Sequence, residues 1–369
     1  MSKICIHKTL SDLGAFLNDS GKVFVVIDSN LKHLYNCFKG CNIIEICTSE
    51  QRKNLDTVVS IAEKLLESGA DRDAFILGVG GGITTDMAGF AASIYKRGVD
   101  FAFVPTTLLA QVDASIGGKN GVNFESYKNI LGTINQPQWV YICAEVLRSL
   151  GVKEFRAGMA EALKTFILFD AEYYSTAISY FEELENYYSQ NGTYLLDGGC
   201  CNGGSHKGEF YKEDVLLEII GKCAQYKCGV VERDEFEKGE RRMLNLGHTF
   251  AHAIEKVCAD SNSYAPIMHG EAVAIGMVLA AKLSAKYYGM SNEFPAKLEE
   301  DLRKVGLPVE VPCNFEGEAV PVNVLVEALK KDKKVKGDSI HFILPKGIGE
   351  VEDVLVPLKV VEGLANDMC

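Results

Sequence analysis

Short apolar runs alternate with helical periodicity along the N-terminal part of the chain. The runs at 22–28 and 42–47 have the length of buried strands, and shorter ones follow at 74–78 and 101–104. Between them, apolar side chains over 49–69 recur at helical spacing. Alternating strands and helices predict a doubly wound, mainly parallel α/β sheet of the Rossmann type.

The pattern changes after residue 153, where long segments with helical periodicity dominate. These segments are 155–169, 214–231, 248–257, 271–288 and 295–305. A stretch rich in Gly and Asn at 186–212 interrupts them and predicts a surface loop. We therefore expect an α/β domain over 1–152 and a mainly α-helical domain over 153–369.

The composition narrows the classes of partner. With 47% hydrophobic and 24% charged residues, the 369-residue chain has the composition of a folded globular protein. Its net charge of −12 disfavours nucleic acid and anionic membranes, and also phosphorylated ligands unless basic residues gather locally.

The longest apolar stretch, 272–281, is half of the ~20 residues that span a membrane. Twelve sparse cysteines and no signal peptide predict a cytoplasmic protein with free thiols.

A glycine cluster at 78–82 leaves a predicted strand and enters a predicted helix. Backbone amides at such a helix start can bind a pyrophosphate, although the cluster alone is equally compatible with a tight turn. Polar residues also follow the first two strands, at the sheet edge where nucleotides bind in open α/β folds. They are Asp28, Asn30, Glu50 and Lys53.

A second group of residues suits a metal ion. His248 and His252 share one helix face, His269 follows later, and Glu161 lies upstream. Imidazoles plus one carboxylate suit Zn²⁺ and leave a coordination position for substrate, whereas structural histidines are the alternative. The spacing pairs His248 with His252. Glu161 and Lys164, three apart, place a carboxylate and an ammonium on one helix face.

Seven basic residues lie in Gly-rich or helical contexts near these candidates. They are Arg97, Lys119, Lys128, Lys164, Lys227, Arg241 and Lys334. Gathered in one place, they would form a local positive site for a phosphorylated acid on an acidic protein.

The order and spacing of motifs over nearly the whole chain resemble the 3-dehydroquinate synthase family. The motifs are GGGITTDMAGF at 80–90, PTTLLAQVDAS at 105–115, GGKNGVN at 117–123, KN at 128–129, GMAEALK at 158–164, DEFEKGER at 234–241, LNLGHT at 244–249, HGE at 269–271 and DKK at 332–334. The resemblance implies a cytoplasmic homodimer with NAD on the N-terminal domain, Zn²⁺ or Co²⁺ on the C-terminal domain, and the active site between them.

The activity that the resemblance implies is a lyase reaction of the shikimate pathway, which leads to chorismate and the aromatic amino acids. It converts 3-deoxy-D-arabino-heptulosonate 7-phosphate (DAHP) to 3-dehydroquinate and phosphate. The steps are transient NAD-dependent oxidation, phosphate elimination, re-reduction, ring opening and intramolecular aldol closure.

The resemblance also implies roles for individual residues. The metal ligands would be Glu161, His248 and His269, so that His252 faces substrate instead. NAD contacts would be Asp28, Asn30, Glu50, Lys53, Gly81, Gly82, Asp86, Thr106, Thr107, Lys119, Lys128 and Ser149. Catalytic and substrate contacts would be Asp113, Lys119, Asn129, Lys164, Lys227, Arg241, Asn245, His252 and Lys334, with Arg97 reaching the neighbouring subunit's site.

Some positions depart from the family pattern, including Thr84, Asn120, Ser149 and Ala251, but none removes a metal ligand. Three alternatives stay open. They are a related sugar-phosphate cyclase, a metal- and NAD-dependent polyol dehydrogenase, and a non-catalytic NAD-binding protein. Basic and amide residues suited to a carboxylate favour dehydroquinate synthesis.

Overall fold

The computed structural model describes residues 2–17, 22–125, 127–196, 209–261, 263–317, 319–330 and 335–367. By its internal contacts the chain forms two compact units. The first is Met1–Phe155 with Thr193–Phe236, and the second is Arg156–Gly192 with Glu237–Cys369. The segment Thr193–Phe236 therefore packs with the N-terminal unit. The division at 152/153 into cofactor-binding and metal-binding parts stays a prediction about function.

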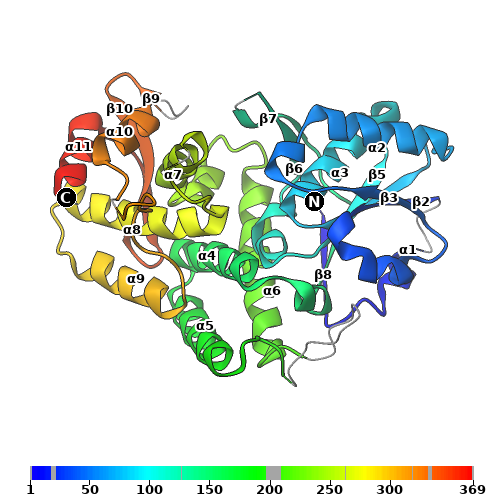
Figure 1. Cartoon of the computed structure of the whole chain (residues 1–369), viewed down its shortest axis with the longest axis horizontal. Helices are drawn as coiled ribbons and strands as arrows, with labels where there is room; N and C mark the ends of the chain where they lie inside the picture. The colour runs from blue at the N-terminus through cyan, green and yellow to red at the C-terminus, as the bar shows by residue number, and fades with distance from the viewer. Residues whose placement is uncertain are drawn as a thin grey trace. The chain divides into compact units, whose positions relative to one another are not determined.

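The first unit is built on a six-stranded sheet in which every pairing is parallel (Figure 1). In spatial order the strands are β1 (Lys3–His7), β8 (Trp139–Cys143), β5 (Asp100–Pro105), β4 (Phe75–Gly80), β2 (Val23–Asp28) and β3 (Asn42–Ile46). Every residue of β4 and β8 is buried, as expected for strands covered on both faces. The doubly wound parallel sheet is confirmed.

Helices cover both faces of this sheet. Helices α2 (Leu55–Glu67) and α3 (Gly82–Ile94) lie on one face, and α1 (Leu13–Leu17) and the 3₁₀ segment η1 (Ser29–Phe38) pack on the other (Figure 1). Gly78 lets α3 approach β4 closely, because a Cβ there would come within 2.9 Å of the Ala88 Cβ. The middle of α3 is thereby held close against β4.

Three further elements complete the first unit. Helix α6 (Glu213–Arg233) packs near β1, where a Cβ on Gly221 would lie 3.0 Å from the Ile6 side chain. An antiparallel hairpin of β6 (Lys119–Phe124) and β7 (Tyr127–Ile134) lies beside α3. Between β5 and this hairpin runs the π-helical turn η4 (Ala110–Ala114).

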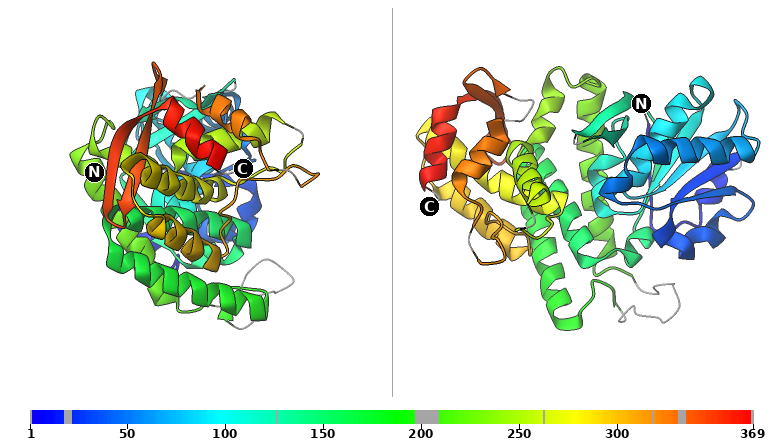
Figure 2. Two further views of the ribbon diagram at one scale, coloured as in Figure 1. Left: turned by 90° about the vertical axis from the view of Figure 1, so that its left-hand side faces the viewer. Right: turned by 45° about the horizontal axis from the view of Figure 1, so that its top comes forward.

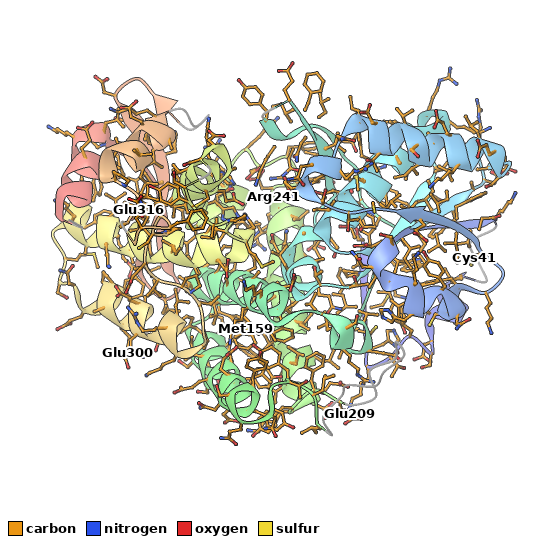
Figure 3. All side chains as sticks on the ribbon, in the orientation of Figure 1. Cys41, Met159, Glu209, Arg241, Glu300 and Glu316 are labelled. Carbon is orange, nitrogen blue, oxygen red and sulfur yellow. The ribbon has the colours of Figure 1, made fainter. Side chains whose placement is uncertain are left out.

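The second unit is mainly helical, as predicted. It contains most of α4 (Val152–Phe169), α5 (Ala171–Asn191), α7 (His248–Asp260), α8 (His269–Tyr288), α9 (Glu293–Lys304), α10 (Val322–Lys330) and α11 (Leu358–Asp367). A small antiparallel sheet of β9 (Val335–Lys336), β10 (Ser339–Gly347) and β11 (Glu350–Pro357) was not predicted. Figure 2 shows its hairpin beside α8. In Figure 3, Met159 lies among the helices, whereas Glu300 is on the outer face of α9.

The predicted surface loop at 186–212 is only partly correct where the structure describes it, because most of these residues are exposed but not all of them form a loop. Residues up to Asn191 continue α5. Leu195 pairs with Phe210 in an antiparallel bridge, and both are buried. The rings of Tyr194 and Phe210 lie 4.9 and 5.5 Å from that of Phe155, which explains why these apolar side chains leave the surface. Residues 197–208 lie outside the described ranges. No helix among the described residues is long and apolar enough to cross a membrane.

Candidate functional site

Three side chains from three helices of the second unit converge on one point. Glu161 comes from α4, His248 begins α7 and His269 begins α8, and one ligand atom from each lies within 4.8 Å of the others. The Nε2 atoms of His248 and His269 lie 3.8 and 3.6 Å from Glu161 Oε1. That oxygen is buried and accepts no hydrogen bond from any described residue. This donor set fits a divalent cation such as Zn²⁺.

Glycines allow the three helices to approach each other. A Cβ on Gly270 would lie 2.1 Å from the Ala157 carbonyl oxygen, so α8 begins directly against α4. A Cβ on Gly276 would lie 2.1 Å from the Gly247 carbonyl oxygen, where α7 begins. Gly247 itself has a φ of +77°, a conformation that favours glycine. The backbone contacts place His248 and His269 side by side.

The second nitrogen of each imidazole is held by a neighbour. His248 Nδ1 lies 3.1 Å from the Leu246 carbonyl oxygen, and His269 Nδ1 lies 3.3 Å from Glu255 Oε1. Burial and the Lys164 ammonium hold the pKa of His248 well below its usual value, which favours the neutral, metal-binding imidazole. Burial opposes charge on His269, but the hydrogen bond and charge of Glu255 raise the pKa of His269 above its usual value.

The geometry groups His248 with His269 rather than with His252, so the pairing inferred from helical spacing is wrong. The His252 ring centre lies 5.7 Å from that of His248 and 6.5 Å from that of His269, outside the Glu161 group. Lys164 forms an ion pair with Glu161 Oε2, and its side chain is almost fully buried. The shared helix face of Glu161 and Lys164 is thus confirmed.

A separate polar cluster lies at the carboxyl edge of the sheet in the first unit. Thr48 donates to Asp28, which also accepts from the Asn30 backbone amide at 2.9 Å. Lys53, in the turn after β3, is buried, and its Nζ lies 2.5 Å from both Asp86 Oδ2 and Asn129 Oδ1. Polar groups from four chain segments therefore meet where a nucleotide would bind in an open α/β sheet.

The glycines of the cluster at 78–82 start α3 at this edge. A Cβ on Gly81 would lie 3.0 Å from the Thr107 side chain, and one on Gly82 would lie 3.1 Å from the Ala114 Cβ. Helix α3 has no side-chain N-cap, so its first amides are left for another acceptor. Thr106 is buried nearby and donates its backbone amide to the Gly80 carbonyl at 2.8 Å.

A buried ion pair joins α6 to the π-helical turn η4. Lys227 Nζ donates to both the backbone oxygen and Oδ1 of Asp113, each at 2.6 Å. The Lys227 side chain is only 10% exposed. π-Helical turns occur frequently at functional sites, and here the turn presents Asp113 to the ammonium. Lys227 therefore belongs by packing to the first unit.

Two family models match consecutive parts of the chain and show which protein family it belongs to. The model of the 3-dehydroquinate synthase N-terminal domain matches residues 43–157, and that of the C-terminal domain matches residues 158–335.

The chain belongs to the 3-dehydroquinate synthase family.

Full-length relatives agree with this membership. The 3-dehydroquinate synthase of Campylobacter fetus is 39% identical over 340 residues, which cover 90% of this chain and 87% of the relative. That of Alkaliphilus metalliredigens is 35% identical over 358 residues, covering 94% and 90%. The family resemblance of the motifs is thereby confirmed, and the protein is an enzyme of this family.

Solved structures place the fold among sugar-phosphate cyclases. The 2-epi-5-epi-valiolone synthase of Streptomyces hygroscopicus, solved with NAD⁺ and Zn²⁺ bound, has a TM-score of 0.80 and 25% identity, covering 100% of this chain and 96% of that one. A 2-deoxy-scyllo-inosose synthase complexed with carbaglucose-6-phosphate, NAD⁺ and Co²⁺ has a TM-score of 0.78 and 24% identity, covering 99% and 96%. A probable glycerol dehydrogenase of Sinorhizobium meliloti is more distant, at a TM-score of 0.60 and 15% identity, covering 100% and 96%.

Four other residues expected from the family pattern lie within the described ranges. Arg241 is buried in the 3₁₀ segment η7 (Glu240–Asn245) and is labelled in Figure 3. Asn245 donates to Glu237 Oε1 at 2.7 Å. Ser149 is exposed at the end of the 3₁₀ segment η5 (Glu145–Ser149). Arg97 is exposed at a φ of +73°, and Lys334 lies outside the described residues.

The sequence reasoning did not single out Glu255, the partner of His269. Glu255 lies seven residues after His248, two helical turns along α7, and that spacing could have indicated it. The contact with His269 could not have been predicted, because it depends on how α8 packs against α7.

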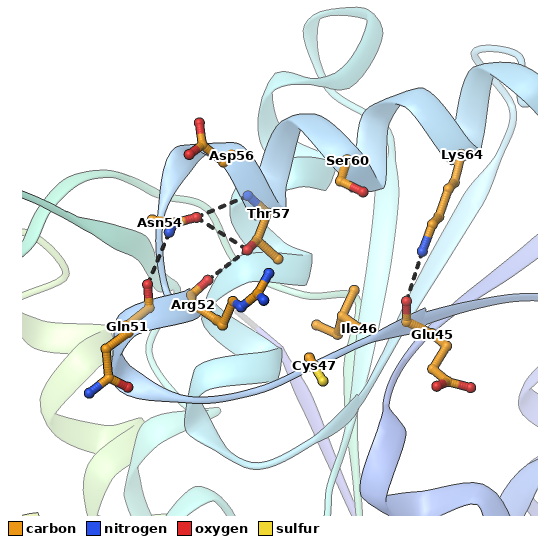
Figure 4. A pocket seen from close by; sticks show the side chains of 10 residues that line it. All are labelled: Glu45, Ile46, Cys47, Gln51, Arg52, Asn54, Asp56, Thr57, Ser60 and Lys64. Atoms are coloured by element: carbon orange, nitrogen blue, oxygen red, sulfur yellow. Dashed lines mark hydrogen bonds between the residues drawn. The ribbon is translucent and has the colours of Figure 1, made fainter.

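A cavity of about 410 Å³ lies between the end of β3 and the first turns of α2 (Figure 4). It is lined by Glu45, Ile46, Cys47, Gln51, Arg52, Asn54, Asp56, Thr57, Ser60 and Lys64. Asn54 caps α2 by accepting from the Thr57 amide, and Lys64 donates to the Glu45 carbonyl oxygen. None of the predicted site residues lines this cavity, but Glu50 and Lys53 are the sequence neighbours of its lining residues Gln51, Arg52 and Asn54.

Proposed function

We propose that this protein is a 3-dehydroquinate synthase that converts DAHP to 3-dehydroquinate and phosphate with NAD and a divalent metal ion. The observation that carries the proposal is the convergence of Glu161, His248 and His269 beside Lys164, in a chain of this family. Two solved cyclases of the same fold hold NAD⁺ with Zn²⁺ or Co²⁺, which supports the same cofactor pair here.

Glu161, His248 and His269 would hold the metal. When bound, the metal would supply a Lewis acid for a substrate oxygen, and NAD would accept a hydride and return it. Lys164 already lies against Glu161, so its buried ammonium is placed to bind an anionic oxygen of the substrate. Glu255 would orient His269 by accepting a hydrogen bond from its Nδ1–H group.

The remaining polar residues would bind and orient the anionic substrate. Arg241 offers a planar guanidinium suited to the carboxylate of DAHP, and Asn245 and His252 would add hydrogen bonds. Lys227, held against Asp113, would bind substrate oxygen, with Lys119, Asn129 and Lys334 as further contacts. These roles rest on the family pattern and on the burial of Lys227 and Arg241.

The cluster at the sheet edge would hold NAD. Gly81 and Gly82 would place the first amides of α3 at the pyrophosphate. The remaining contacts would come from Asp28, Asn30, Glu50, Lys53, Asp86, Thr106, Thr107, Lys119, Lys128 and Ser149. This assigns cofactor binding to residues 1–152 and metal and substrate binding mainly to residues 153–369.

A cytoplasmic homodimer completes the proposal. The β6–β7 hairpin exposes Phe124, Tyr127, Ile130 and Ile134, with 40–55% of each residue accessible, a surface suited to a second copy of the chain. Arg97, on an exposed turn after α3, would then reach the neighbouring active site.

The decisive experiment measures phosphate release from DAHP by the purified protein, with and without a metal chelator. Heptulose 7-phosphate and glucose 6-phosphate test the related cyclases, and glycerol with NAD⁺ tests a polyol dehydrogenase. We expect metal-dependent release from DAHP alone, sustained for many turnovers by trace NAD. Activity only on a sugar phosphate without a carboxylate, or stoichiometric consumption of NAD, would refute the assignment.

A further inference from the structure

One side chain, Asn123, connects the 3₁₀ turn η2 (Glu50–Arg52) to the β6–β7 hairpin. Its Nδ2 donates to Glu50 Oε1 at 2.8 Å and to the Glu50 carbonyl at 3.3 Å. Its backbone amide donates to the Lys53 carbonyl at 2.8 Å, and its Oδ1 accepts from the Asn129 amide at 2.9 Å. The 2.5 Å contact of Lys53 Nζ with Asn129 Oδ1 closes a ring of three residues, Asn123, Lys53 and Asn129, to which Glu50 is joined through Asn123.

The backbone makes this ring possible. The register between β6 and β7 shifts here: Val122 pairs with Leu131 and Phe124 with Tyr127, so Asn123 faces a bulge in β7 formed by residues 128–130. Opposite this bulge Asn123 is not paired in the ladder, and its backbone amide pairs with the Lys53 carbonyl instead. Asn129 has a φ of +51°, a left-handed conformation that costs an L-residue about 1 kcal/mol or more. The hydrogen bond to Asn123 Oδ1 holds Asn129 in that conformation.

We propose that Asn123 is a positioning residue that couples the cofactor edge to the substrate-binding hairpin. It fixes Glu50 and Lys53, which would contact NAD, relative to Asn129, which would contact substrate. The inference rests on the proposed function, because the ring has a catalytic consequence only if these residues bind those ligands. The Asn123 side chain donates through Nδ2 to Glu50 and accepts through Oδ1 from the Asn129 amide.

This donor and acceptor arrangement gives a directional test. Asn123→Asp keeps the acceptor for Asn129 but sets a carboxylate against Glu50. We expect NAD affinity to fall about 30-fold, from one lost hydrogen bond and the like-charge contact. In a Glu50→Gln background, the amide of the new Gln at position 50 can donate to the carboxylate of the new Asp at position 123. In that background the Asn123→Asp change should alter NAD affinity by less than about 3-fold. Titration calorimetry with NAD⁺ measures all four proteins.

A matched control separates positioning from general loosening of the hairpin. Asn135, just after β7, donates to Ser93 Oγ at 3.0 Å and takes no part in the ring. Asn135→Ala should leave NAD affinity within about 2-fold, whatever its effect on the melting temperature. For Asn123→Asp we expect the KM for DAHP to rise with NAD present at saturation, because Asn129 shares the ring.

The outcomes distinguish this inference from the proposed function. If the wild-type protein binds NAD but Asn123→Asp weakens binding equally in both backgrounds, or not at all, the positioning role is wrong and the function stands. If the wild-type protein neither binds NAD nor releases phosphate from DAHP, the function fails. In that case, amide hydrogen exchange over residues 127–131 tests whether the ring of hydrogen bonds exists. Faster exchange in Asn123→Ala supports it, and unchanged exchange overturns it.

Discussion

Glu255 is expected to control how tightly the second unit binds its metal ion. Its Oε1 lies 3.3 Å from Nδ1 of His269, whose Nε2 is directed toward Glu161. A carboxylate in this position fixes the imidazole tautomer and raises its basicity, so that Nε2 is the coordinating atom. Glu255→Gln keeps the size of the side chain and removes the charge.

The structure sets the size of the effect. Loss of such an outer-shell partner lowers metal affinity by about 10–100-fold. The contact is long, and the His269 side chain is 37% exposed while that of Glu255 is 10% exposed, so solvent weakens the interaction. We therefore expect the lower end, about 10-fold or roughly 1.4 kcal/mol, for Glu255→Gln. Glu255→Ala should lose more, because it removes the acceptor as well.

Competition with a fluorescent zinc chelator measures the metal affinity directly, without turnover. Glu299→Gln is a matched control, since Glu299 pairs with Lys282 and Arg303 instead of with a metal ligand. Excess Zn²⁺ should restore phosphate release in Glu255→Gln. An unchanged zinc affinity in Glu255→Gln, or an equal loss in Glu299→Gln, would show that the contact does not act on the metal site.

Two further substitutions test packing and charge. Gly276→Ala forces a Cβ to within 2.1 Å of the Gly247 carbonyl, so we expect a loss of about 3 kcal/mol in unfolding free energy and weaker zinc binding. Urea unfolding measures the change in unfolding free energy. Gly347→Ala is the control, because nothing lies within 4 Å of the new Cβ there. Equal stabilities of the two variants would contradict the close approach of α8 and α7. Lys227→Met removes the ammonium that Asp113 holds, and kcat/KM for DAHP should fall at least about 100-fold. Lys222→Met on the same helix is the comparison, and a similar fall there would refute a specific role for Lys227.

The sheet of the first unit was largely predictable because its strands are continuous apolar runs. Strands β2, β4 and β5 follow those runs, since nearly every residue in them is buried. The edge strand β3 was predicted from its apolar run as well, although it is only partly buried. Strand β1 was missed because only one of its five residues is buried, so its apolar signal is weak. Strand β8 is fully buried and forms a continuous apolar run that ends before Glu145, so the same signal could have indicated it.

The candidate metal-binding group of Glu161, His248 and His269 could not be predicted from helical spacing alone. His248 and His252 share a helix face, and local periodicity therefore paired them. The observed partner of His248 is His269, which approaches only because Gly270 and Gly276 let α8 contact α4 and α7. That contact is long-range, and no local pattern encodes it. The family motifs did indicate the set of Glu161, His248 and His269 that the structure brings together. Such motifs reflect the tertiary structure of the family, whereas the periodicity of one helix reflects only that helix.

The buried lysines change how the acidic charge of the chain should be understood. Lys53, Lys164 and Lys227 are all buried, and each has a carboxylate partner in Asp86, Glu161 and Asp113. Burying an unpaired ammonium is very costly, so local pairing is what allows these cations to lie inside the protein. The pairs are close to neutral by themselves. A divalent cation held by Glu161 would leave the Lys164 region positive, so anion binding there depends on the metal rather than on the number of lysines.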